Sequence, residues 1–399
     1  MRKLFVILAL AIINTGMMSC LCSCEDGMPA PLPLIKDEEI QDITSEDIEP
    51  NMNSEAVELL SGLGPHIVCN SITTNKRYFA FSINDSFYMV AGNSGSKETI
   101  RELNLTTGNL QTICKDPLCH HNKLPCINAY NYISRCVYNN ELYVLGEYMK
   151  TLDDGRKFIG KISIQEGKME ILHEWLPSLS ANSLSFEYFD GYLYYTKATS
   201  DTTNEIYRFS LSSRREEQVS SLEDYIVVFA IGNEHIYFRN NYDVLKQASL
   251  DFGVVEEIDS GVSMVFPCEE SVYYFKNAYS SDGNMSGYNL IRMNGAAKNK
   301  ETVIVGAFNP GMTLYDEGSF YYTVYDYASD KTVYRYHAET GAVRAYPIDH
   351  GSRCDVFAVL DHILVLKIFT DFDPASGDRS VEYYLYDTET NRKIPIYCE

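Results

Sequence analysis

The sequence is poor in cations and in tryptophan, and it lacks long helical patterns. It carries 33 Lys and Arg against 55 Asp and Glu, for a formal net charge of −22, and it has one Trp. Binding to nucleic acid or to an anionic lipid surface depends on clustered Lys and Arg, so we expect no nucleic-acid partner. The shortage of 3.6-residue periodicity argues against a helical bundle and favours β-strands.

Motifs of common catalytic sites are also absent. The sequence has no Gly-x-Ser-x-Gly nucleophile elbow and no phosphate-binding loop. His173-Glu174 lacks the second histidine of a helical zinc-protease motif. The acidic segment Asp371–Glu382 has Ala375 and Ser376 where a calcium loop needs a ligand and a glycine, which favours a polar hairpin turn. We therefore expect a binding role rather than catalysis.

The N-terminal apolar run is too short to span a membrane comfortably. Arg2 and Lys3 precede the apolar residues Leu4–Ile13, and small or polar residues follow. A membrane-spanning helix needs about 20 apolar residues, whereas a positive start, a short apolar run and small residues are typical of a secretory signal peptide. The sequence therefore predicts export from the cytosol.

Small residues stand directly before two of the cysteines that follow. Ser19 precedes Cys20, and Ser23 precedes Cys24. The segment resembles a bacterial lipoprotein signal, in which such a cysteine becomes the lipidated first residue of the mature chain. The resemblance implies a signal peptide over residues 1–19 and lipidation of Cys20, which lies nearer the apolar run, with Cys24 as the alternative. Several acyl chains give stable anchoring, so we expect an extracytoplasmic protein anchored to the bacterial cell membrane.

Residues 20–64 have the composition of a flexible tether. Three prolines lie near its start, and residues 36–50 are rich in Asp and Glu. Such a segment cannot bury enough apolar surface to fold alone. Residues 54–60 are expected to form a short helical turn.

From residue 65 onward a short, mostly aromatic strand recurs seven times. Tyrosine is abundant, with 31 residues, and aromatic residues favour strands. Each copy follows a polar turn, is preceded by a short apolar strand, and is followed by two more strands. The anchor residues of the seven copies are Tyr88, Tyr143, Tyr194, Tyr237, Tyr273, Tyr321 and Leu364. Four strands recurring every 40–50 residues or so are the signature of a β-propeller.

We therefore predict an all-β protein. A β-propeller of seven four-stranded blades occupies residues 65–399 and follows the signal peptide and the disordered tether. One such sheet cannot cover both of its faces, and radial stacking of the blades buries them. Two β-sandwiches are the alternative architecture.

Two blade sequences carry a resemblance to a known propeller type. They read Leu-Tyr-Tyr-Thr at residues 193–196 and Phe-Tyr-Tyr-Thr at residues 320–323. The repeats resemble the propellers of uncharacterised bacterial, clostridial-type lipoproteins related to the low-density-lipoprotein-receptor type, whose blades carry Tyr-Trp-Thr-Asp. The Trp and Asp are missing here, so the resemblance is architectural and implies no active site.

A Cys/His insert at residues 113–127 interrupts the longest repeat. It reads Cys-x4-Cys-His-His-x4-Cys, and Cys136 lies ten residues further on. It resembles a Cys-x-x-Pro-x-Cys-x-His insert of the same exported lipoproteins, which implies no activity. The matching residues are Cys114, Pro117, Cys119, His121 and Cys126.

Two chemical interpretations of the insert remain open. Export favours oxidation of thiols, so Cys114, Cys119, Cys126 and Cys136 are disulfide candidates. The eight cysteines after residue 64 are an even number, but spacing does not reveal their pairing. Alternatively Cys114, Cys119, His121 and Cys126 bind zinc through three thiolates and an imidazole. We expect disulfides and no cofactor, with zinc as the alternative and free thiols as the remaining outcome.

The expected function is a binding or protein-interaction module whose ligand is a protein, a peptide or a glycan. The alternative is an extracytoplasmic enzyme acting on glycans or peptides, with carboxylates from different blades converging at the propeller channel. A metal-responsive sensor built on the Cys/His insert is a third hypothesis. His235 and His362 occupy matched positions in the repeat, and we interpret both as turn or blade-face residues.

Overall fold

The computed structural model describes part of the chain in detail. The described residues are 52–64, 69, 72–73, 80–92, 99–114, 126–148, 156–176, 185–199, 203–220, 225–232, 234–268, 271–294, 299–306, 313–323, 332–348, 353–369 and 380–398. They all belong to the second of two units, residues 49–399. The predicted signal peptide, Cys20, Cys24, Cys119 and His121 lie outside them. None of the helices described is long and apolar enough to cross a membrane.

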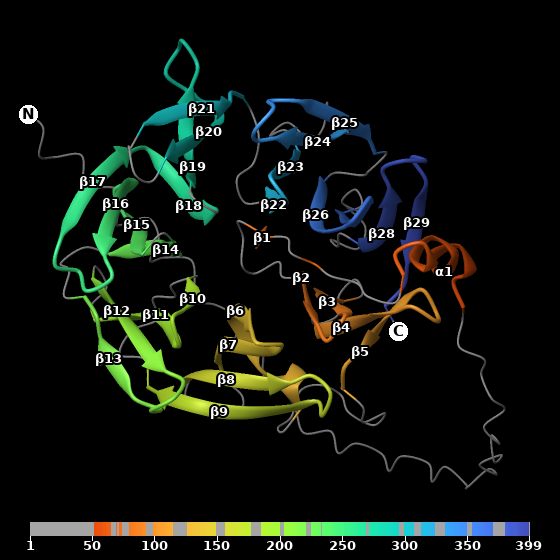
Figure 1. The fold of residues 1–399 in the computed structure, drawn as a ribbon, viewed down its shortest axis with the longest axis horizontal. Helices are drawn as coiled ribbons and strands as arrows, with labels where there is room; N and C mark the ends of the chain where they lie inside the picture. Colours follow the sequence, from red (N-terminus) through yellow and green to blue (C-terminus); the bar gives the residue numbers. More distant parts are fainter. Residues whose placement is uncertain are drawn as a thin grey trace, which may run out of the picture. The chain divides into compact units, whose positions relative to one another are not determined.

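Seven antiparallel sheets form the blades of a ring (Figure 1). Each blade takes four consecutive strands, beginning at the ring centre and ending at the rim. The prediction of an all-β propeller with seven four-stranded blades is therefore confirmed.

The bounds of the strands follow their rank within the blades. The first strands of blades one to seven are β2 (Ala80–Ile83), β6 (Asn131–Tyr138), β10 (Phe186–Phe189), β14 (Ile226–Gly232), β18 (Val262–Cys268), β22 (Leu314–Asp316) and β26 (Arg353–Leu360). The second strands are β3 (Ser86–Ala91), β7 (Glu141–Glu147), β11 (Tyr192–Ala198), β15 (His235–Asn240), β19 (Ser271–Tyr279), β23 (Ser319–Thr323) and β27 (Ile363–Phe369). The third strands are β4 (Thr99–Asn104), β8 (Lys157–Ser163), β12 (Asn204–Ser210), β16 (Val244–Ser249), β20 (Met285–Asn294), β24 (Thr332–His337) and β28 (Val381–Asp387). The fourth strands are β5 (Asn109–Thr112), β9 (Lys168–Trp175), β13 (Glu216–Gln218), β17 (Val255–Ser260), β21 (Lys300–Ile304), β25 (Val343–Pro347) and β29 (Lys393–Ile396).

The repeat anchors explain why the blades stack. All seven lie on second strands, and each is at most 5% exposed. Side chains of a strand alternate between its two faces, so every sheet presents apolar groups to both neighbours. The buried apolar side chains accordingly form seven clusters, one between each pair of adjacent blades.

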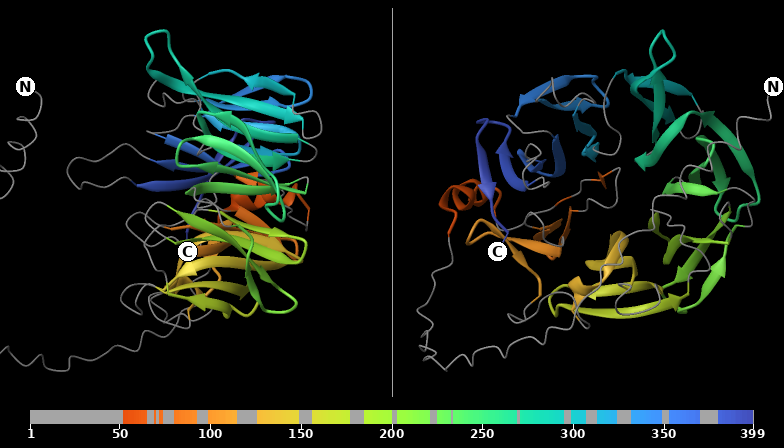
Figure 2. Two further views of the ribbon diagram at one scale, coloured as in Figure 1. Left: turned by 90° about the vertical axis from the view of Figure 1, so that its left-hand side faces the viewer. Right: turned by 180° about the vertical axis from the view of Figure 1, so that it is seen from behind.

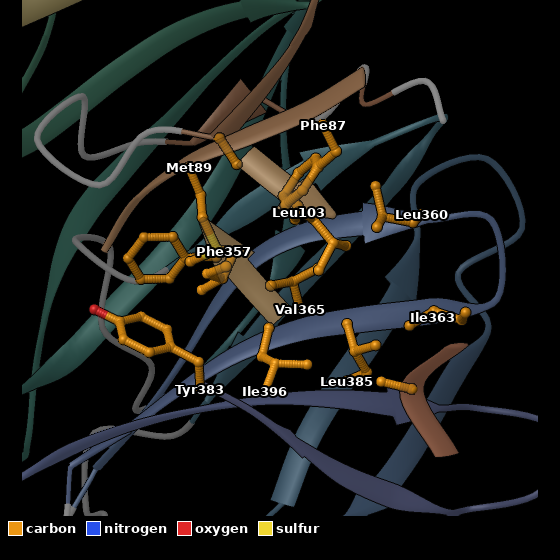
Figure 3. Close-up of a cluster of buried hydrophobic side chains, with 14 of the residues drawn as sticks. Phe87, Met89, Leu103, Phe357, Leu360, Ile363, Val365, Tyr383, Leu385 and Ile396 are labelled. Carbon is orange, nitrogen blue, oxygen red and sulfur yellow. The ribbon is translucent and has the colours of Figure 1, made fainter. Parts of the chain in front are cut away.

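Helix α1 (Ser54–Ser61) closes the ring at the seam between blades one and seven. Ala56 and Leu60 are buried in the seam cluster, which joins side chains of both blades (Figure 3). Asn53 caps the helix and also bonds to both blades: its backbone N–H donates to the Thr107 carbonyl (2.8 Å) and its side chain to the Pro395 carbonyl (2.6 Å). The packed unit thus begins before residue 65, within the segment that the sequence assigns to the tether.

Gly108 shows how closely the helix approaches blade one. It has a φ of +71°, and a Cβ at this position would lie 2.7 Å from the Cβ of Ala56. Only glycine satisfies both the left-handed backbone and the contact. The chain end completes the seam, since the Leu110 N–H donates to the Tyr397 carbonyl (2.8 Å).

A short additional strand, β1 (Ile72–Thr73), lies at the inner edge of blade six. It pairs antiparallel with β22, so this sheet has five strands. Strand β1 lies between α1 and blade one in the sequence. In space it lies near the centre of the ring (Figure 1). Strand β1 therefore covers part of the inner edge of blade six.

The connections between strands differ at the two faces of the ring. The first and second strands of a blade are joined by tight turns such as Asn139–Asn140, where both residues have positive φ, as in type I′ hairpins. The opposite strand ends carry longer connections, for example from Phe369 to Val381. The strands run across the thickness of the ring (Figure 2). We call the two sides the short-turn face and the long-connection face.

Candidate functional site

A groove of about 560 Å³ opens between blades six and seven on the short-turn face. Blade six contributes Arg335 and Arg344 to it together with two carboxylates, Asp316 and Glu317. Blade seven contributes Asp361, His362 and Glu389. We call it the six–seven groove. It gathers charged groups of both signs in one place, which is the first requirement of a polar binding site.

The two arginines are held in place by neutral groups. Arg335 donates from Nε to the Ser319 hydroxyl (3.1 Å), and Arg344 donates from Nη2 to the Thr388 carbonyl (2.7 Å). Their guanidinium carbons lie 5.8 Å from the ring centre of Tyr321 and 5.0 Å from that of Tyr346, respectively. Within the described part of the chain, neither arginine forms an ion pair. Both positive charges therefore remain available to a ligand.

The opposite wall is acidic and centres on a histidine. The Asp361 carboxylate lies 2.9 Å from Nδ1 of His362. This hydrogen bond raises the pKa of His362, and the negative charges of Glu389 and Asp387 add to the effect, while burial lowers it. The Thr388 hydroxyl donates to the backbone carbonyl of His362 (2.7 Å). This bond ties the turn of Thr388 to the backbone of His362.

A second groove, of about 480 Å³, lies between blades one and two on the same face. Its charged lining residues include Glu141, Lys161 and Glu170. Here the charges are already paired inside the protein. Lys161 forms an ion pair with Glu141, and Glu170 lies 3.2 Å from Arg214. This groove is a weaker candidate for binding a charged ligand.

The structure brings together two of the predicted disulfide cysteines. Cys114 follows β5, and Cys126 directly precedes the 3-10 helix η1 (Ile127–Ala129) that leads into blade two. Their Sγ atoms are 3.7 Å apart, whereas a disulfide bond is about 2.05 Å long. Cys136 instead packs against the cluster between blades two and three. The disulfide remains a prediction.

The zinc alternative also remains a prediction. Two of its four ligands, Cys119 and His121, lie outside the described residues. In the parts of the chain that are described, no group of three or more His, Cys, Asp or Glu side chains is arranged to hold a metal ion.

Cys354, His235 and His173 lie outside both grooves. Cys354 is fully buried between blades six and seven, and burial raises the pKa of its thiol, so it is a small core residue. His235 lines neither groove, unlike its repeat counterpart His362. His173 lies on strand β9, not on a helix.

A carboxylate near the ring axis is already paired. Asp355, on the first strand of blade seven, accepts two hydrogen bonds of 2.9 Å from Arg353. Burial raises the pKa of Asp355, and the charges of Arg353 and Lys367 oppose that rise. This arrangement fits an internal salt bridge better than a free catalytic acid.

Sequence reasoning missed a polar network between blades two and three. The Glu216 carboxylate accepts hydrogen bonds from Lys197 (2.5 Å) and Tyr195 and lies 3.0 Å from His173 Nε2. Burial raises the pKa of Glu216, but these partners outweigh it and lower the value to about 2. The Lys197 ammonium also lies 4.8 Å from the centre of the Trp175 ring. The members come from three strands on two blades, so no local motif reveals them.

Comparisons with known proteins show similarity in fold and assign no activity to this chain. No protein-family model matches the chain, and no curated protein matches it. A computationally designed protein, Ika8, is 13% identical over 83% of this chain and 89% of its own, with a TM-score of 0.43. A puromycin hydrolase S511A mutant complexed with PGG is 11% identical over 85% of this chain, with a TM-score of 0.50. The match covers 54% of the hydrolase, so this chain spans about half of its length.

Proposed function

We propose that the chain is a lipid-anchored, extracytoplasmic binding module that holds a polar ligand in the six–seven groove. The supporting observation is the groove itself, where two arginines that form no ion pair with any of the described residues face an acidic wall. Sites that bind ligands are concave and place a few polar groups with fixed orientation. The N-terminal signal supports the location, since Cys20 follows a short apolar run and a small residue.

Anchoring is tested by replacing both candidate lipidation cysteines. We expect wild type to fractionate with membranes and to incorporate a fatty-acid label. Cys20→Ala combined with Cys24→Ala should lose the label and leave the membrane fraction. Cys22→Ala is the matched control, because Cys22 follows the large residue Leu21, and it should remain anchored. A double variant that stays membrane-bound refutes the lipid anchor.

Binding is tested with the mature lipoprotein in detergent on arrays of synthetic peptides and of glycans. The proposal expects reproducible ligands on at least one array, and absence of ligands on both contradicts it. The same preparation should hydrolyse neither chromogenic glycosides nor aminoacyl amides. Hydrolysis of either substrate class would instead support the enzyme hypothesis.

A further inference from the structure

Three of the seven blades share a cross-strand row of a tyrosine, a cation and a glutamate, from which blade six departs. Blades one, four and seven carry other residues in this row. In this row the second-strand anchor lies beside a third-strand residue, which lies beside a fourth-strand residue. Blade three has Tyr194, Arg208 and Glu217 in register. Blade five has Tyr273, Arg292 and Glu301. Blade two has Tyr143, Lys161 and Glu170. In blade six the row reads Tyr321, Arg335 and Arg344, so an arginine stands in the position of the glutamate.

The replacement leaves two like charges directly opposite one another. In blade five Arg292 Nη2 lies 2.6 Å from the Glu301 carboxylate, and in blade three Arg208 donates to Glu217. Cross-strand neighbours have Cβ atoms about 5 Å apart, and equal charges there destabilise a sheet. Blade six thus carries an unfavourable pair where two other blades carry a neutral one. A bound anion would remove this cost.

The arginine pair is also oriented toward the groove. Arg335 is half-buried, Arg344 is exposed, and both line the six–seven groove. Tyrosine rings and neutral acceptors hold the two guanidinium groups. A guanidinium presents a fork of N–H donors that matches a carboxylate. The pair therefore forms a preorganised site for an oxyanion.

The rest of the groove narrows the class of ligand. Four carboxylates also line it, and their negative charges disfavour a dianion such as phosphate: Asp316, Glu317, Asp361 and Glu389. Their oxygens can accept hydrogen bonds from amide or ammonium donors. The rings of Tyr321 and Tyr346 are buried and offer no open face on which a sugar would stack.

We propose that Arg335 and Arg344 bind a carboxylate of a peptide ligand, while N–H donors of the same peptide face Asp361 and Glu389. This inference rests on the proposed binding function and names the ligand class of that site.

The test uses an array of random 12-residue peptides and the full lipoprotein in detergent. The strongest binders should contain Asp or Glu, and replacing those residues by Asn or Gln should weaken binding at least tenfold. Arg335→Gln combined with Arg344→Gln should cause a similar loss. Arg208→Gln and Arg292→Gln are matched controls from the equivalent row in blades three and five, and both should bind like wild type.

Arg344→Glu separates loss of binding from loss of folding. This change places a glutamate opposite Arg335, as in the Arg–Glu pairs of blades three and five. Because it replaces two like charges by an ion pair, it should raise the melting temperature, and it should reduce peptide binding at least tenfold. Undiminished binding by this variant overturns the proposal. Stronger binding of phosphoserine peptides than of glutamate peptides overturns the carboxylate assignment. If only the glycan array yields ligands, the peptide inference fails and the binding function stands; if both arrays are silent, both fail.

Discussion

Replacement of Leu60 by alanine should loosen the seam that closes the ring. Leu60 is 1% exposed and packs in the cluster shared by blades one and seven. Leu→Ala changes at buried sites cost about 2–5 kcal/mol. Helix α1 has eight residues, and a helix of this length is not stable without its packing. If it detaches, the two bonds from Asn53 are also lost, at about 1 kcal/mol each. With detachment of the helix we therefore expect a loss of about 4–7 kcal/mol in the free energy of unfolding, and without it a loss of about 2–5 kcal/mol.

The single tryptophan supplies a distant reporter for this experiment. Trp175 lies on the outer strand of blade two, and its fluorescence in urea can be compared with circular dichroism of the whole sheet content. If the ring unfolds as one unit, Leu60→Ala shifts both curves equally. Glu58→Ala is the control on the same helix, because Glu58 is exposed, and it should change stability by less than about 0.5 kcal/mol. A shift below about 1 kcal/mol for Leu60→Ala would refute the role of α1 at the seam.

Two further predictions concern the cysteines and the acid network. Trypsin cleaves after Lys115, Lys123 and Arg135, so separate peptides carry Cys114, Cys119, Cys126 and Cys136; under non-reducing conditions we expect the peptides of Cys114 and Cys126 to be linked. Stoichiometric zinc, with both thiols alkylated only after chelation, would support the metal alternative. The pKa of Glu216 is about 2 in the fold, below the usual value for glutamate of about 4.3. Its stabilising effect is therefore complete above pH 4.3 and declines as the pH falls toward 2. Glu216→Gln should be less stable than wild type at pH 7, and the difference should shrink over this acid range; a difference that does not depend on pH would contradict this reasoning.

The sequence predicts the blades because their signal is local. Each anchor lies next to its own turn. Successive side chains of a strand point to opposite faces of the sheet, so a run of apolar and aromatic residues such as Leu193, Tyr194 and Tyr195 predicts burial on both faces. Seven such signals suffice to count the blades. The polar turns likewise predict the hairpins, since Asn139 and Asn140 tolerate the left-handed backbone that a two-residue turn requires.

The candidate site is harder to predict because its residues are brought together by register and by blade packing. Arg335 and Arg344 are nine positions apart in the sequence, and their direct opposition depends on where the hairpin pairs. Asp361 and Glu389 join them only when blade seven packs beside blade six. The role of Asn53 is similarly hidden, since its bond to the Pro395 carbonyl spans 342 positions of the chain.

The position of α1 determines where a pull on the proposed lipid anchor would act on the propeller. The chain that carries the proposed lipid enters the ring through Asn53, whose bonds to Thr107 and Pro395 bridge the first and last blades. Tension between the membrane and the propeller would therefore load the joint that keeps the ring shut, before it reaches any other blade. A pull on the proposed anchor would therefore act against the Asn53 hydrogen bonds and the packing of Leu60 in the seam cluster.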